Sequence, residues 1–124
     1  MDEKGRFLGD QLLALIAASQ VQKSNDVVVT TVDASRVVEV AVERAGGKVV
    51  RTKVGDVAVA QEVVRRGGVF GGEPSGSWIF PEVHMAPDGP LAALKIVELV
   101  ERSGRRLSEL VDELPRYFTL REKL

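Results

Sequence analysis

The chain has 124 residues, of which 44% are hydrophobic and 28% charged, a composition typical of one globular domain. Lys and Arg number 17 against 18 Asp and Glu, and this balance excludes a general binder of nucleic acids or anionic membranes. The absence of Cys excludes disulfides and thiolate metal sites, and a single His excludes a zinc site built from histidines. The longest apolar run, Leu12 to Ala18, is far shorter than the ~20 residues that a membrane span needs. The charged N-terminus lacks a signal-peptide core, so we expect a soluble cytoplasmic domain.

Hydrophobic periodicity and turn residues predict strands that alternate with helices. In chain order, we expect a helix at 12–18, a strand at 27–32, a helix at 37–45, a strand at 48–52, a helix at 57–66, a strand from 69, a strand at 78–80, a long helix opened at 88–90 and ended at 103–104, and a short helix at 107–114. The β-branched run at 27–32 is typical of a buried parallel strand. Turn residues at 73–76 favour an antiparallel pairing of the last two strands.

These elements predict an α/β three-layer domain, with a four-stranded mixed sheet between helices. The domain is expected to span 1–115, and 116–124 to be a linker or tail. Asp10, Asp56 and Asp88 stand where helix N-caps are expected. In the long helix, five apolar side chains are expected to face a core: Leu91, Leu94, Ile96, Val97 and Val100.

The segment Gly71 to Ser77 is the most unusual part of the sequence, with three glycines, a carboxylate, two hydroxyls and a proline. One interpretation is a loop that binds a hydroxyl-rich ligand such as a sugar, because Glu73 can accept hydrogen bonds from sugar hydroxyls and Ser75 can both donate and accept. Glycines allow close approach of the backbone, and Pro74 stiffens the loop. The other interpretation is a hairpin turn. The glycine spacing excludes a dinucleotide fingerprint, and no Gly-Lys-Ser/Thr ends the segment as in a P-loop.

A second candidate segment, Lys53 to Asp56, follows another strand. Ligands of open α/β sheets bind at the carboxyl ends of the strands, so both segments can share one edge. Lys53 could hold a phosphate or sugar oxygen, although a solvated lysine also fits the spacing. Trp78 is expected in the core, and His84, with no partner nearby in sequence, is expected to be structural rather than catalytic.

Four segments together resemble one enzyme family. The run Gly71-Gly72-Glu73-Pro74-Ser75-Gly76 resembles the Gly-Glu-x-Ser-Gly sugar-binding loop in the third domain of α-D-phosphohexomutases, which include phosphoglucomutases, phosphomannomutases and phosphoglucosamine mutases. The order and spacing of three further segments also fit this family: Arg51-Thr52-Lys53-Val54-Gly55-Asp56, Asp88-Gly89 with Leu91-Ala92-Ala93-Leu94, and Gly5-Arg6-Phe7-Leu8-Gly9-Asp10. The region around Trp78 and His84 to Gly89 is most similar to archaeal phosphoglucosamine mutase-type members.

The resemblance implies a role in carbohydrate metabolism. Family members are isomerases that move phosphate between the 1- and 6-positions of a hexose phosphate through a phosphoserine, with magnesium on a loop of another domain. This chain has no such serine loop, metal loop or C-terminal phosphate loop, so no catalytic residue, cofactor or metal ligand is assigned to it. By position, the resemblance implies that Glu73 and Ser75 bind sugar hydroxyls, Lys53 approaches the sugar or its phosphate, and Gly72 and Gly76 shape the loop. Ser77 stands where a histidine is common in the family.

Two functions remain open from the sequence. The chain is expected to be the sugar-recognition domain of a phosphohexomutase, inactive alone, with a hexose phosphate and the remaining domains of the parent enzyme as partners. The alternative is a stand-alone module that binds a sugar phosphate or a protein without catalysis. A domain taken from a larger enzyme should expose apolar surface where its neighbours packed, whereas a module that evolved alone should not.

Overall fold

The computed structural model describes residues 9–114. Nine elements follow one another along these residues: α1 (Gly9–Gln20), β1 (Val27–Thr31), α2 (Val37–Arg44), β2 (Lys48–Thr52), α3 (Asp56–Arg66), β3 (Phe70–Gly72), β4 (Trp78–Ile79), α4 (Gly89–Ser103) and α5 (Leu107–Asp112). The expected α/β fold with a four-stranded mixed sheet is confirmed. The expected tail at 116–124 and the motif residues before Gly9 lie outside the described residues.

The sheet has the strand order β2-β1-β3-β4. β1 pairs in parallel with β2 and β3, whereas β3 and β4 are antiparallel, as the turn residues between them predicted. The register places Thr31 opposite Thr52, and Thr30 opposite Gly72. The three parallel strands therefore end at one edge of the sheet.

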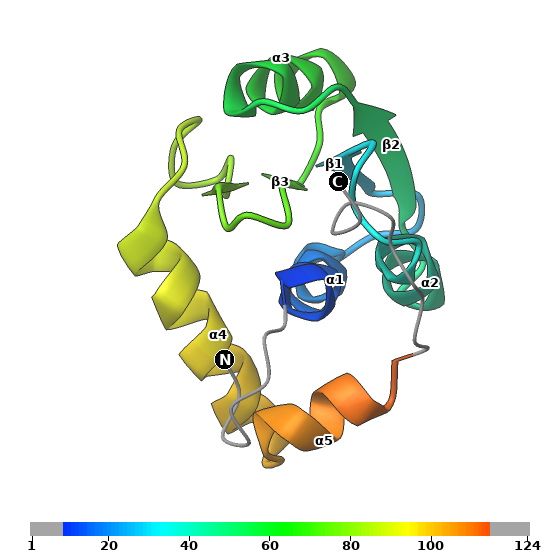
Figure 1. Ribbon diagram of the computed structural model, residues 1–124, viewed down its shortest axis with the longest axis vertical. Coiled ribbons are helices and arrows are strands. Elements are labelled where there is room, and N and C mark those ends of the chain that lie inside the picture. Colours follow the sequence, from blue (N-terminus) through cyan, green and yellow to red (C-terminus); the bar gives the residue numbers. More distant parts are fainter. Residues whose placement is uncertain (1–8, 115–124) are drawn as a thin grey trace, which may run out of the picture.

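Helices cover both faces of the sheet, with α3 on one side and α1 and α2 on the other (Figure 1). The side chains of β1 alternate between the two layers, because Val28 belongs to the core beneath α1 and α2, whereas Val29 packs with Val59 and Val63 of α3. Phe70 packs edge-on against Trp78 and Phe80 in the larger core, so Trp78 is a core residue as expected.

Two of the three expected caps are corrected by the structure. Asp88 is the N-cap of α4, since its Oδ1 accepts a hydrogen bond from Leu91 N at 2.9 Å. Asp56 instead occupies the first turn of α3, whose N-cap is Gly55. Asp10 lies in the first turn of α1, and its Oδ1 accepts a hydrogen bond from Ser35 N at 2.8 Å, so it holds a distant loop.

The expectation for α4 was wrong in part. Leu91 and Ile96 pack against the larger core, but Leu94 is 66% exposed and Val97 is 53% exposed. The helical pattern identified an apolar helix, but it did not distinguish the side that meets α1 from the side that meets solvent.

Candidate functional site

The two candidate segments meet at the carboxyl edge of the parallel strands. Lys53–Asp56 follows β2, and Glu73–Ser77 follows β3. Glu73 Oε1 accepts a hydrogen bond from Gly55 N at 3.0 Å, which joins the two segments directly. Glu73 is only 7% exposed, so this carboxylate is held in place rather than free in solvent. The expectation that both segments share one edge is confirmed.

The Glu73–Ser77 loop is closed by its own hydrogen bonds. Glu73 N donates to Ser77 O at 3.3 Å, and the carbonyl of Glu73 accepts from Gly76 N and from Trp78 Nε1, each at 3.1 Å. Gly76 has a φ of +106°, a conformation that residues with a Cβ rarely adopt. The loop is therefore preformed, which lowers the entropy lost when a ligand binds.

Gly72 is required by close packing at the base of the loop. A Cβ at this position would lie 2.8 Å from Leu13 Cδ1, 2.9 Å from Trp78 Cδ1 and 3.0 Å from Phe70 Cε2. The carbonyl of Gly72 accepts a hydrogen bond from the buried Thr30 Oγ1 at 2.9 Å. Gly72 thus fixes where the loop leaves the sheet.

The remaining site residues are open to solvent to different degrees. Lys53, Ser75 and Gly76 are exposed, and Ser77 is half-buried. An ammonium group, a hydroxyl and a buried carboxylate at one edge can together donate to and accept from the oxygens of a hydroxyl-rich ligand. The two interpretations of this segment, a hairpin turn and a ligand-binding loop, are compatible, because the turn that joins β3 and β4 carries the Glu73 carboxylate.

His84 does have a partner, in contrast to the expectation from sequence. Its Nε2 lies 2.9 Å from Asp88 Oδ2, four residues along the chain. Two hydrogen bonds hold the pKa of Asp88 below its ordinary value; the one with His84 contributes most, and the one from the Leu91 backbone contributes next. The pair stabilises the start of α4, and neither residue takes part in the hydrogen bonds that join the two candidate segments.

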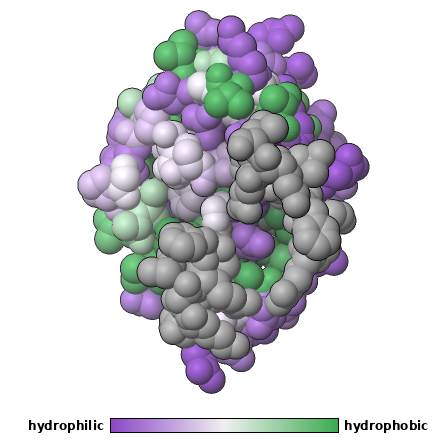
Figure 2. Space-filling view, in the orientation of Figure 1, coloured by the Kyte–Doolittle hydropathy of each residue, from purple (hydrophilic) through white to green (hydrophobic). Residues whose placement is uncertain are grey.

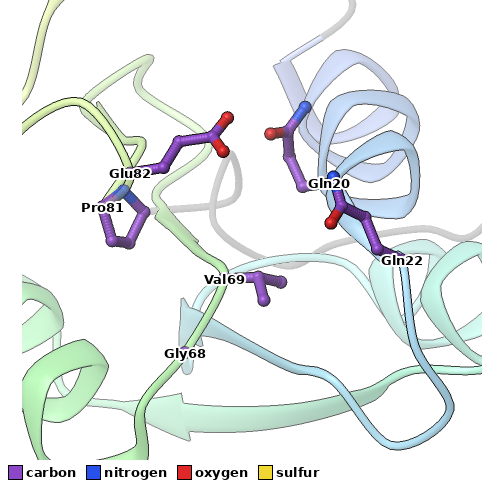
Figure 3. Close-up of a pocket in the computed structure, with 6 residues that line it drawn as sticks. All are labelled: Gln20, Gln22, Gly68, Val69, Pro81 and Glu82. Carbon is purple, nitrogen blue, oxygen red and sulfur yellow. The ribbon is translucent and has the colours of Figure 1, made fainter.

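Among the described residues, two of the hollows lie near the sheet. The larger, of about 360 Å³, borders the candidate loop and is lined by Gly9, Leu12, Pro74, Ser75, Gly76, Trp78, Gly89, Ala92, Ala93 and Ile96. The smaller, of about 170 Å³, lies at the amino end of β3, where Gln20 and Glu82 face each other across it (Figure 3). No residue of the candidate site lines the smaller hollow, so the opposite edge of the sheet is distinct from the site.

Between residues 9 and 114, no three His, Cys, Asp or Glu side chains gather in a way that could hold a metal ion. Over the same residues, no helix has the length and apolar character needed to cross a membrane. The family resemblance places magnesium on a loop of another domain, so no step of a reaction is assigned to a metal in this chain.

The comparisons with known proteins agree with this arrangement. Residues 8–118 match the family model "Phosphoglucomutase/phosphomannomutase, alpha/beta/alpha domain III". The phosphoglucosamine mutase of Methanococcus maripaludis strain C7 is 47% identical over 126 residues, which is 100% of this chain and 28% of that protein. The phosphoglucosamine mutase of Methanocaldococcus jannaschii is 45% identical over the same shares of both proteins.

A solved structure shares the fold. The Burkholderia thailandensis protein of the phosphoglucomutase/phosphomannomutase family superposes with a TM-score of 0.78 at 23% identity, over 90% of this chain and 25% of that one. The chain thus spans about a quarter of the length of the proteins it matches. Because the family model covers all of the described residues, the chain belongs to the phosphoglucomutase/phosphomannomutase family and corresponds to its domain III.

Proposed function

We propose that this chain is the sugar-recognition domain of a phosphohexomutase, which moves phosphate between the 1- and 6-positions of a hexose phosphate through a phosphoserine outside this chain. The hydrogen bond from Gly55 N to the buried Glu73 carboxylate carries the proposal, because it assembles both strand-end segments into one polar edge before any ligand arrives. The names of the relatives favour glucosamine phosphate as the hexose phosphate.

Each site residue has a defined task in this proposal. Glu73 accepts hydrogen bonds from sugar hydroxyls, and the exposed Ser75 hydroxyl donates to or accepts from a neighbouring one. The exposed Lys53 ammonium supplies a point charge for the sugar phosphate or a ring hydroxyl. Gly72 and Gly76 hold the loop backbone in place, and Ser77 closes it by accepting from Glu73 N.

The phosphoserine and the magnesium would come from other domains of a cytoplasmic parent enzyme. Phosphoryl transfer depends on positioning and on the stabilisation of charge, so a domain that only positions the sugar has no activity alone. This chain should therefore bind hexose phosphates weakly and should not interconvert them.

Exposed apolar side chains favour a domain with neighbours over a stand-alone module. Leu94 and Val97 are exposed on the outer side of α4, and Val57 and Val64 are 67% and 68% exposed on α3. Hydrophobic surface is visible on the α4 side of the molecule and at the α3 end (Figure 2). Such surface is typical of faces that pack against another part of a larger protein.

The proposal is tested by heteronuclear NMR titration of the 124-residue chain with the 1-phosphates of glucosamine, glucose and mannose. We expect shifts confined to the amides of 53–56 and 72–77, largest with glucosamine 1-phosphate. Glu73→Ala should abolish these shifts, while Glu43→Ala, at an exposed site on α2, should leave them intact. Glu73→Gln keeps an oxygen that can accept from Gly55 N, so it separates loss of the charge from loss of the loop.

Two results would contradict the proposal. One is the absence of shifts at these amides when the hexose phosphates reach millimolar concentration. The other is conversion of glucosamine 1-phosphate to the 6-phosphate by the chain alone, as monitored by phosphorus NMR. Such conversion would contradict the proposal because no group that it assigns to this chain can transfer the phosphate.

A further inference from the structure

Arg51 opens the segment 51–56, which resembles the family, but the proposed function gives Arg51 no contact with the sugar. It is the fourth residue of β2, and its side chain is 24% exposed. Its Nε and Nη2 donate to the two carboxylate oxygens of Glu39 at 2.7 and 2.6 Å, and this pairing raises the pKa of Arg51. The paired charges form a planar, two-bond fork between β2 and α2.

The rest of the Arg51 guanidinium is directed at a backbone loop. Nη1 donates to the carbonyls of Thr31 and Ala34, each at 2.8 Å, and Nη2 donates to the carbonyl of Ser35 at 3.2 Å. One side chain thus satisfies three carbonyls within the turn from β1 into α2. Lysine, a compact point charge without a planar fork, cannot reproduce this pattern.

The same turn is held from two further sides. Asp10 Oδ1 accepts from Ser35 N at 2.8 Å, and Val32 N donates to Thr52 O at 2.9 Å. The turn comprises residues 32–35 and follows β1, which lies between β2 and β3 in the sheet. It therefore leaves the sheet between the Lys53–Asp56 and Glu73–Ser77 segments, at the same edge.

We propose that Arg51 is a positioning residue that fixes the 32–35 turn as the middle wall of the candidate sugar site. This inference rests on the proposed function. Arg51 itself touches no ligand, because its N–H groups are already committed to Glu39 and to the three carbonyls. Its effect on binding passes through the shape of the turn.

The test compares Arg51→Lys with Arg65→Lys in the 124-residue chain. Arg65 is an exposed arginine on α3 whose ion pair is with Glu62. Ligand-free amide shifts and hydrogen exchange are measured for 32–35, and the dissociation constant for glucosamine 1-phosphate is measured by titration. We expect Arg51→Lys to stay folded, to accelerate exchange at 32–35 and to weaken binding about tenfold, since a charge-assisted fork is lost. Arg65→Lys should change none of these.

A third variant tests whether a loss of stability by itself would weaken ligand binding. Val42→Ala removes methyl groups from the buried side of α2 and should lower stability without altering affinity. Unchanged affinity in a folded Arg51→Lys would overturn the proposal while leaving the proposed function intact. Should Arg51→Lys fail to fold, Glu39→Gln replaces it: faster exchange at 32–35 with weaker binding supports the proposal, and unchanged behaviour overturns it.

Hydrogen exchange at 32–35, measured without ligand, tests the positioning role of Arg51 independently of the proposed function. If the wild-type chain binds no hexose phosphate, the proposed function fails. In that case faster exchange confined to 32–35 in Arg51→Lys still supports a positioning role for Arg51, and unchanged exchange there refutes it.

Discussion

Replacing Gly72 with Ala is the sharpest test of how the candidate loop is anchored. The added Cβ would lie between 2.8 and 3.0 Å from atoms of Leu13, Trp78 and Phe70, inside the 3.4 Å at which ordinary contact begins. Leu13 and Phe70 are fully buried and Trp78 is 4% exposed, so none of these side chains can move aside into solvent.

Overpacking of this kind costs about 1–3 kcal/mol of unfolding free energy. For a chain of this size, we expect a fall in Tm of roughly 4 °C per kcal/mol. Urea denaturation and calorimetry of Gly72→Ala measure both quantities. The loop should also shift away from Gly55, so the amides of Glu73 and Gly55 should change in the NMR spectrum.

Gly89→Ala is the matched control for this experiment. A Cβ at Gly89, in the first turn of α4, meets no heavy atom within 4 Å apart from its chain neighbours, so this variant overpacks no core. Because Pro90 follows and disfavours a helical residue with a Cβ before it, no gain in stability is expected, but the loss should stay below that of Gly72→Ala. A Gly72→Ala chain with wild-type stability and unshifted loop amides would refute the packing argument, as would a Gly89→Ala chain that loses more stability than Gly72→Ala.

Two further predictions concern the core and the start of α4. Phe80→Ala should lower the unfolding free energy by about 3–5 kcal/mol, because Phe80 is 1% exposed and packs edge-on against Phe70 at a centroid distance of 5.2 Å. Urea denaturation measures the loss, and a much smaller loss would show that neighbouring side chains collapse into the cavity. The depressed pKa of Asp88 means that its ionised form stabilises the fold at pH values above its ordinary pKa of 3.8, and that this contribution is lost as the pH falls through the lower folded-state value. The stability difference between the wild type and Asp88→Asn should therefore shrink in strong acid, and a difference that stays constant with pH would contradict the assignment of the hydrogen bonds from His84 and Leu91 N to the carboxylate.

Local sequence patterns were sufficient to predict most elements of the fold. The run of β-branched residues from Val27 onward predicted β1, and the Gly pairs that follow α2 and α3 marked the ends of both helices. These patterns report local backbone preference and local hydrophobicity, which do not depend on distant residues. The expected strand at 78–80 was shorter in the structure, since only Trp78 and Ile79 pair with β3.

Contacts between distant segments were beyond the reach of such patterns. The sequence marked Glu73 as a candidate ligand residue, but not that its carboxylate meets Gly55 N, 18 residues earlier. It marked Asp10 as a helix cap, whereas the folded chain uses Asp10 to hold Ser35, 25 residues away. In each case the sequence identified the accepting carboxylate, but not the backbone N–H that donates to it.

The sequence by itself determined the α/β class, the order of the elements and the polar loop at 72–77, because each depends on residue types that are close together in the chain. The tertiary structure alone decided that the Glu73 carboxylate meets Gly55 N, which side of α4 is exposed and what Arg51 holds. These features arise from the strand order β2-β1-β3-β4, which brings the ends of three strands together although they are widely separated in sequence. A hydrogen bond or a buried face exists only once both partners are in place, and packing, rather than local preference, brings them together.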